Sequence, residues 1–89
     1  MKMVYKYDLF PNDYATLKLP KGYKILSFQA QKLSVCIWAL VDPEAELEEV
    51  KFRLCGTGHA ISEENLEYIG TTQKDIGITR LVWHLFKLT

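Results

Sequence analysis

The sequence predicts an all-β fold, because apolar and polar residues alternate with a period of two along most of the chain. The alternating runs are short, and turn-forming residues such as Pro20-Lys21-Gly22 separate them. About seven such strands, mainly antiparallel, are typical of a small β-sandwich or a partly open barrel. We therefore expect a single β domain that spans residues 1–89.

The first two strands are expected at Val4–Leu9 and Tyr14–Leu19, with a turn at Phe10–Asp13 between them. After the second strand, Pro20 fixes φ and Gly22 permits a positive φ. This combination predicts a tight hairpin that leads into the third strand.

The third and fourth strands are expected at Lys24–Gln31 and Ser34–Val41, joined by a turn at Gln31-Lys32-Leu33. One face of the third strand carries Leu26, Phe28 and Ala30, and the other carries Ile25, Ser27, Gln29 and Gln31. The fourth strand is apolar on both faces. It is therefore expected to be central in a sheet, or to carry a second buried surface such as a subunit interface.

The acidic segment 42–46 is expected to be a loop, with at most one helical turn begun by Pro43. A fifth strand at Glu49–Cys55 points Val50, Phe52 and Leu54 inward, and Lys51, Arg53 and Cys55 outward. Beyond it we expect a glycine loop at 56–59, at most one helical turn near 62–66, and a short strand at Tyr68–Gln73 that Gly70 interrupts. A loop at 74–76, with Gly77 as a hinge, precedes the last strand, Ile78–Leu88.

The composition excludes several classes of function. The formal net charge is zero, which argues against a protein that binds DNA or RNA polymers. No apolar run reaches the roughly 18 residues of a membrane span, and the N-terminus lacks a signal-peptide core, so a cytoplasmic protein is expected. Cys36 and Cys55 are expected to be free thiols, and a zinc site is improbable with only two histidines. No cofactor is expected.

The candidate binding residues suit a nucleotide. Backbone N–H groups of the loop Gly56-Thr57-Gly58-His59 could bind a phosphate, and Arg53 could donate two hydrogen bonds to one. Trp38 could stack on a base, and amides and hydroxyls could read base edges. The residues of this last kind are Gln29, Gln31, Thr71 and Gln73.

Each of these residues also has a structural interpretation that the sequence leaves open. The loop could be a tight inter-strand connection with a surface histidine, and Arg53 could pair with an acid such as Glu49. Trp38 could belong to the core, and the glutamines to a solvated strand face. Catalytic patterns fit poorly, because nothing at a recognisable spacing orients His59 towards Cys55.

Five motifs, which together span most of the chain, carry a family resemblance. They are Leu19–Ser27, Trp38–Pro43, Gly56–His59, Tyr68–Thr71 and Leu81–Phe86. They resemble a family of small phage and prophage proteins that is catalogued as a domain of unknown function and is similar to anti-CBASS sponge proteins. The resemblance implies a homo-oligomer, a dimer or a tetramer, with ligand pockets between subunits. It also implies binding of a cyclic dinucleotide such as 3′,3′-cyclic GMP–AMP, without cleavage, in the cytoplasm of the host cell.

Two other classes of function stay open. One is a protein-interaction or virion accessory module with no small-molecule ligand, which the abundance of apolar and aromatic residues would suit. The other is a small hydrolase or metal-dependent enzyme that uses His59 and His84.

Overall fold

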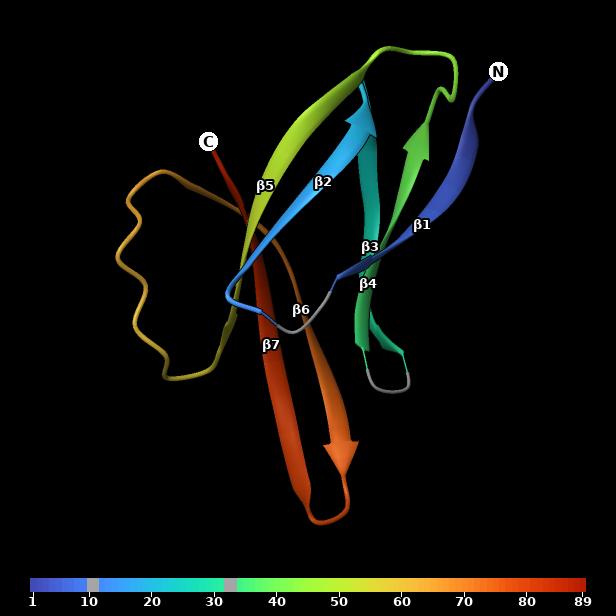
Figure 1. The fold of residues 1–89 in the computed structure, drawn as a ribbon. Coiled ribbons are helices and arrows are strands. Elements are labelled where there is room, and N and C mark those ends of the chain that lie inside the picture. Colours follow the sequence, from blue (N-terminus) through green and yellow to red (C-terminus); the bar gives the residue numbers. More distant parts are fainter. Residues whose placement is uncertain (10–11, 32–33) are drawn as a thin grey trace.

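The computed structural model describes residues 1–9, 12–31 and 34–89. These residues form seven strands in two antiparallel sheets and no helix (Figure 1). The strands are β1 (Met3–Leu9), β2 (Tyr14–Pro20), β3 (Lys24–Gln31), β4 (Ser34–Val41), β5 (Leu47–Gly56), β6 (Leu66–Ile76) and β7 (Thr79–Leu88). The all-β prediction is confirmed, and the two-sheet arrangement is a sandwich and not a closed barrel. Since the described residues form no helix, none of their segments is a helix that could cross a membrane.

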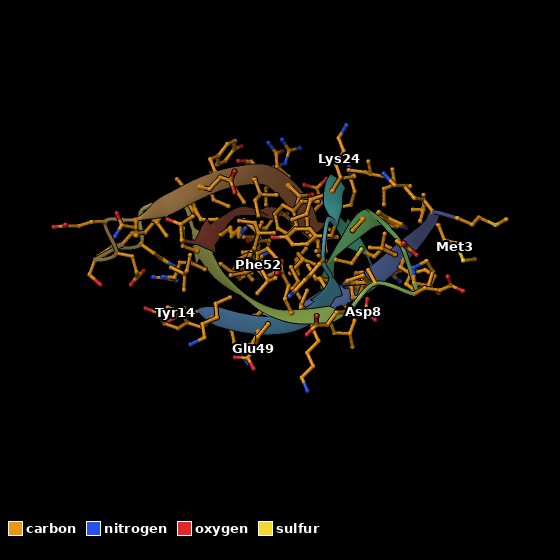
Figure 2. All side chains as sticks on the ribbon, turned by 90° about the horizontal axis from the view of Figure 1, so that it is seen from above. Met3, Asp8, Tyr14, Lys24, Glu49 and Phe52 are labelled. Carbon is orange, nitrogen blue, oxygen red and sulfur yellow. The ribbon has the colours of Figure 1, made fainter. Side chains whose placement is uncertain are left out.

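The two sheets enclose one apolar core. The strand order is β1-β4-β3 in the three-stranded sheet and β2-β5-β7-β6 in the four-stranded sheet. The first sheet contributes Leu9, Phe28, Val35 and Ile37, and the second contributes Leu19, Val50, Phe52, Leu54 and Leu85. Phe52 lies between the sheets (Figure 2). Each such side chain, fully buried, contributes about 1.5–3 kcal/mol of transfer free energy, so this core is the main source of stability.

The fourth strand has the bounds and the central place that the sequence predicts. β4 pairs with β1 on one side and with β3 on the other. Val35, Ile37 and Ala39 are buried on the core side, whereas Trp38 on the other side is half-buried.

The expected hairpin at Pro20–Gly22 is wrong. The turn itself exists, because the Tyr23 N–H donates to the Pro20 carbonyl oxygen at 3.2 Å and Gly22 has a φ of 83°. However, β2 pairs with β5 and β3 pairs with β4, so the turn carries the chain from one sheet to the other. A tight turn has the same local chemistry in both cases, and only the burial of the strand faces selects the partners.

The expected faces of the third strand need one correction. A β-bulge between Ile25 and Ser27 interrupts the alternation in β3. As a result, Ile25 and Phe28 both pack on the core, while Leu26 is 48% exposed. A bulge adds one residue against the partner strand, so the period-two pattern cannot locate it.

The last hairpin is longer than predicted. Lys74 to Ile76, expected as a loop, continue β6 and pair with Leu81 to Thr79 of β7. Gly70 does not break the strand, because a bulge between Tyr68 and Gly70 absorbs it. The hairpin turns at Gly77, which has a φ of 60°, and its tip extends beyond the other strands (Figure 1).

The segments 42–46 and 62–65 are loops, and neither contains the single helical turn that the sequence left open. At 42–46, the Asp42 carboxylate and carbonyl accept hydrogen bonds from the N–H groups of Glu44 and Ala45, which closes a tight turn in place of a helix. The expected turns at Phe10–Asp13 and Gln31-Lys32-Leu33 include residues 10–11 and 32–33, which lie outside the described residues.

Candidate functional site

The candidate residues divide between the two outer faces of the sandwich. Gln29, Gln31 and Trp38 share the outer face of the three-stranded sheet. Arg53, Thr71 and Gln73 share the outer face of the four-stranded sheet, on which the glycine loop also lies. One copy of the chain therefore does not gather all of them into one pocket.

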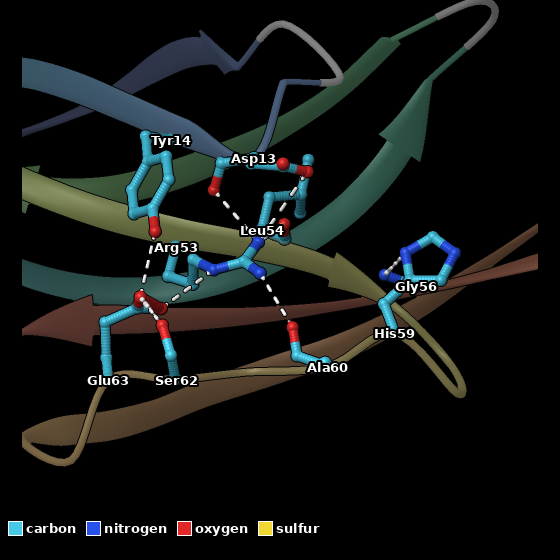
Figure 3. A network of polar contacts seen from close by, with 9 residues as sticks. All are labelled: Asp13, Tyr14, Arg53, Leu54, Gly56, His59, Ala60, Ser62 and Glu63. Carbon is cyan, nitrogen blue, oxygen red and sulfur yellow. Dashed lines mark hydrogen bonds and ion pairs between the residues drawn. The ribbon is translucent and has the colours of Figure 1, made fainter.

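Arg53 ties the loop 57–65 to the four-stranded sheet (Figure 3). Although it lies on the outer face of β5, its exposed fraction is only 7%. Its Nε donates to Glu63 Oε1 at 2.9 Å, and its Nη2 donates to the Ala60 carbonyl oxygen at 3.2 Å. Its Nη1 donates to the carbonyl oxygens of Leu54 at 2.7 Å and Asp13 at 3.3 Å.

The acids beside Arg53 are Glu63 and Asp13, and not the Glu49 that the structural interpretation of the sequence named. Asp13 Oδ1 lies 3.7 Å from Nη1. The Tyr14 ring lies over the guanidinium, 5.1 Å from its centroid to Cζ. Chain groups already accept from four of the five N–H groups of the guanidinium, so a phosphate that binds Arg53 through two N–H groups would have to displace at least one of them.

Glu63 is the second centre of this network. Its Oε2 accepts hydrogen bonds from the Tyr14 hydroxyl at 2.8 Å and from the Ser62 hydroxyl at 3.1 Å. The hydrogen bonds from Tyr14 and Arg53 lower the pKa of Glu63, and the bond to Glu63 raises the pKa of Tyr14. The carboxylate is therefore held in its charged form, opposite a buried cation.

The glycine loop folds His59 back onto its own backbone. The His59 N–H donates to the Gly56 carbonyl oxygen at 3.1 Å, and the Gly56 N–H donates to His59 Nδ1 at 3.3 Å. A Cβ at Gly56 would lie 2.9 Å from His59 Cε1, so a side chain at this position would collide with the ring. Because Nδ1 accepts, the neutral ring carries its proton on Nε2, and this N–H is the group with which His59 can donate to a ligand.

A second polar group lies where the glycine loop meets β6 and β7. Hydrogen bonds join Thr57 Oγ1 to His84 Nε2 at 2.7 Å, and Thr71 Oγ1 to His84 Nδ1 at 3.0 Å. A third bond of 2.6 Å joins Thr71 Oγ1 to the Tyr68 hydroxyl. We call Thr57, Tyr68, Thr71 and His84 the hydroxyl–imidazole cluster. A neutral imidazole donates through one nitrogen and accepts through the other, so the two threonines have opposite roles toward it.

The structure thus brings together Thr57 and Thr71, two of the candidate residues, through His84, which the candidate set omitted. The alternation along 78–88 places His84 on the outward face with Val82 and Phe86, and this pattern is the signal that could have found it. Tyr68 also packs edge-on against Phe86, with ring centroids 5.6 Å apart.

A hollow of about 210 Å³ lies beside this cluster, at the end of β5. The pairing of β5 with β7 stops at Gly56 and Trp83, so β7 continues without a β5 partner from Val82 back to its start. The lining residues are Gly56, Thr57, His59, Arg80, Leu81, Val82 and Trp83. The hollow therefore combines loop backbone, one cation and a half-buried tryptophan that packs against the core, and it shares Thr57 with the cluster.

The remaining candidate residues lie apart from this hollow. The amide of Gln29 donates to the Ser27 hydroxyl at 3.0 Å, and Gln31 and Gln73 are exposed on their strands. Both cysteines are free and buried, Cys36 in one sheet and Cys55 in the other, and burial raises the pKa of both thiols. In the part of the chain that the structure describes, no three potential metal-ligating side chains gather in one place.

Comparison with known proteins gives one match. The family described as a domain of unknown function (DUF7352) matches residues 1–89. No curated protein and no solved structure matches the chain.

Proposed function

The chain belongs to the family of the domain of unknown function DUF7352, and from its own residues we propose that it binds a small signalling nucleotide without chemical turnover. The proposed ligand is a cyclic dinucleotide such as 3′,3′-cyclic GMP–AMP. The chain would sequester it intact in the cytoplasm of a bacterial host and so block a CBASS-type defence. This last step rests on the resemblance to sponge proteins described above.

The observation that carries the proposal is the hydroxyl–imidazole cluster beside the glycine loop. Threonine and tyrosine hydroxyls, an imidazole and loop N–H groups are types of group that can donate to phosphate oxygens, and they supply no large positive field. This arrangement suits a compact dianion better than a long polyanion, in agreement with the zero net charge of the chain. Trp83 in the adjoining hollow is a candidate plate for a purine.

We further propose that two or four copies complete each binding site. The candidate residues Gln29, Gln31 and Trp38 lie on the opposite outer face from the cluster, so only a second copy could place them beside it. A two-fold ligand also suits a two-fold interface.

The test is thermal unfolding in the presence of a panel of cyclic di- and trinucleotides, with the ligand recovered and analysed afterwards. At a free ligand concentration of about 1,000 times Kd, binding adds about 4 kcal/mol to the free energy of unfolding. We expect a selective rise in melting temperature and intact ligand. A flat response across the panel, or recovery of a cleaved ligand, would refute the proposal.

Two threonine variants make this test specific. Thr71→Val keeps the shape of the side chain but removes the hydroxyl that joins Tyr68 to His84, so most of the ligand-induced shift should disappear. Thr16→Val is the matched control, because Thr16 is exposed on the same outer face but lies on β2. Equal shifts in the two variants would show that the cluster does not hold the ligand.

A second candidate function is that of a protein-interaction or virion accessory module, and the exposed apolar residues of β1 favour it. This strand is the edge of its sheet, and Met3, Val4 and Tyr5 are all exposed. An apolar edge strand is a template for pairing with another chain. If this function is correct, Val4→Lys should abolish capture of a protein partner, and purified protein should retain no nucleotide.

A further inference from the structure

Two edge strands from different sheets meet at one corner of the sandwich. β3 ends the three-stranded sheet, β6 ends the four-stranded sheet, and the two strands are in contact. Each strand is bulged at this place, β3 between Ile25 and Ser27 and β6 between Tyr68 and Gly70. Gly70 lies against Phe28 at this contact, where a Cβ would meet Phe28 Cβ at an ordinary van der Waals distance of 3.5 Å.

The two bulges border a hollow of about 460 Å³. Its lining residues are Gly22, Tyr23, Ile25, Leu26, Ser27, Phe28, Glu67, Tyr68, Ile69 and Lys87. Bulges re-aim side chains and are frequent beside binding sites, and here the β3 bulge leaves Leu26 exposed as an apolar wall. The volume is in the range of pockets for small molecules.

A cation points toward the inside of the sandwich at this corner. Lys87 occupies the inward row of β7 that also holds Leu85, and it stands in register with Phe52 of β5 and Glu67 of β6. Its Nζ lies 5.4 Å from the centroid of the Tyr23 ring. Among the described residues it forms no ion pair. Hydrogen bonding with the Tyr23 side chain is the largest cause that raises the pKa of Lys87, so the ammonium stays charged.

Beside Lys87, the hydroxyl oxygen of Tyr23 is buried and has no group of the described residues within hydrogen-bond distance, so its polar interaction is a longer one with the Lys87 ammonium. Buried hydroxyls in proteins are nearly always paired, and an unpaired one destabilises the fold. Tyr23 and Lys87 both line the hollow, and a hydroxyl donor next to an ammonium without an ion-pair partner has the properties of a site that an acceptor completes.

We propose that this corner binds a small organic carboxylate whose body is flat or apolar. The carboxylate accepts from the Tyr23 hydroxyl and Lys87 Nζ, and the apolar body packs against Leu26 and the bulged segment of β3. Glu67 lines the same hollow, and the charges of Glu67 and Glu48 already act on Lys87. A ligand with a single negative charge therefore fits better than a ligand with two. The site is separate from the proposed nucleotide site, although Tyr68 lies at the border of both.

The experiment is a two-dimensional amide NMR titration with benzoate, with benzylamine and benzyl alcohol as probes of the same shape. We expect benzoate to shift the amides of Gly22, Leu26 and Glu67, and the other two probes to leave them in place. Equal shifts with all three probes would overturn the proposal, because the corner would then be only an apolar surface. The absence of any shift with benzoate would also overturn it.

Three variants distinguish a binding role from a structural one. Tyr23→Phe removes the unpaired hydroxyl but keeps the ring, so the melting temperature should hold or rise while benzoate affinity falls about tenfold. Lys87→Gln should reduce the affinity by about tenfold or more, since it removes a charge-assisted hydrogen bond. Lys24→Gln, on the exposed outer face of β3, is the control and should change nothing. Benzoate affinity that is unchanged in both Tyr23→Phe and Lys87→Gln would overturn the assignment.

Discussion

Replacement of Arg53 by methionine should destabilise the protein strongly, although the residue lies on the outer face of a sheet. Methionine matches the length of the aliphatic stem, so the change removes mainly the guanidinium. The four hydrogen bonds from the guanidinium to Glu63, Leu54, Asp13 and Ala60 disappear together. The Glu63 carboxylate, whose side chain is only 20% exposed, then keeps its charge without a cation beside it.

The size of the loss follows from burial. The Arg53 side chain is 8% exposed, and removal of one partner of a buried ion pair costs about 3–5 kcal/mol. For a domain of this size, 1 kcal/mol corresponds to roughly 4–8 °C in melting temperature. We therefore expect a loss of about 3 kcal/mol in urea unfolding, and a fall of more than about 10 °C in melting temperature.

The chain contains a matched control for this experiment. Arg80 Nε lies 2.8 Å from Asp75 Oδ1, a distance close to the 2.9 Å between Arg53 Nε and Glu63 Oε1. In the Arg80–Asp75 pair, however, both side chains are exposed. Arg80→Met should therefore leave the urea midpoint almost unchanged. If Arg53→Met and Arg80→Met shifted the midpoint equally, the argument from burial would be wrong. The loss of stability in the double variant Arg53→Met with Glu63→Gln should be smaller than the sum of the losses in the two single variants, because the two side chains act as one unit.

Three further predictions concern Glu63, Gly56 and the two buried cysteines. Because the folded protein lowers the pKa of Glu63 below its usual 4.5, its contribution to stability is present above that pH and is lost as pH falls through the folded pKa. Between about pH 7 and pH 2, the melting temperature should therefore fall less steeply on acidification for Glu63→Gln than for the unchanged protein. Gly56→Ala should destabilise the protein by roughly 1 kcal/mol, because the new Cβ displaces the His59 ring. Adding His59→Ala to this variant should restore most of the lost stability. If the loss persists in the double variant, its cause is the backbone at position 56 and not the ring. Cys36 and Cys55 should react with a thiol reagent only at the rate of unfolding, and a fast reaction under native conditions would contradict their burial.

The local pattern of apolar and polar residues predicted the bounds of a strand correctly where both faces of the strand are apolar. β4 is apolar on both faces, and its bounds Ser34–Val41 were predicted correctly because turn-forming sequences, Gln31-Lys32-Leu33 and Asp42-Pro43, flank the apolar run. β3 was also correctly bounded, yet the exposure of Leu26 was not predicted, since the bulge depends on how β3 meets the corner with β6.

The candidate site shows the same division. The glycine loop was recognised from its residue types, and the structure shows why Gly56 is required: the His59 ring lies against it. Arg53 was identified as a special residue, but its true partners, Glu63 and Asp13, are ten and forty positions away in the chain. No pattern of neighbouring residues contains that information, because a loop of this length can cover either face of a sheet.

The sequence by itself determined the fold class, the number of strands and most of their ends to within one residue, because period-two alternation and turn chemistry act over a few residues. Only the tertiary structure decided which strands pair, that the turn at Pro20–Gly22 joins two sheets, and that His84 links Thr57 to Thr71. It also decided that Lys87 faces the inside of the sandwich beside an unpaired hydroxyl. These features arise from burial of apolar faces between distant segments, which is a property of the whole chain and not of any local stretch.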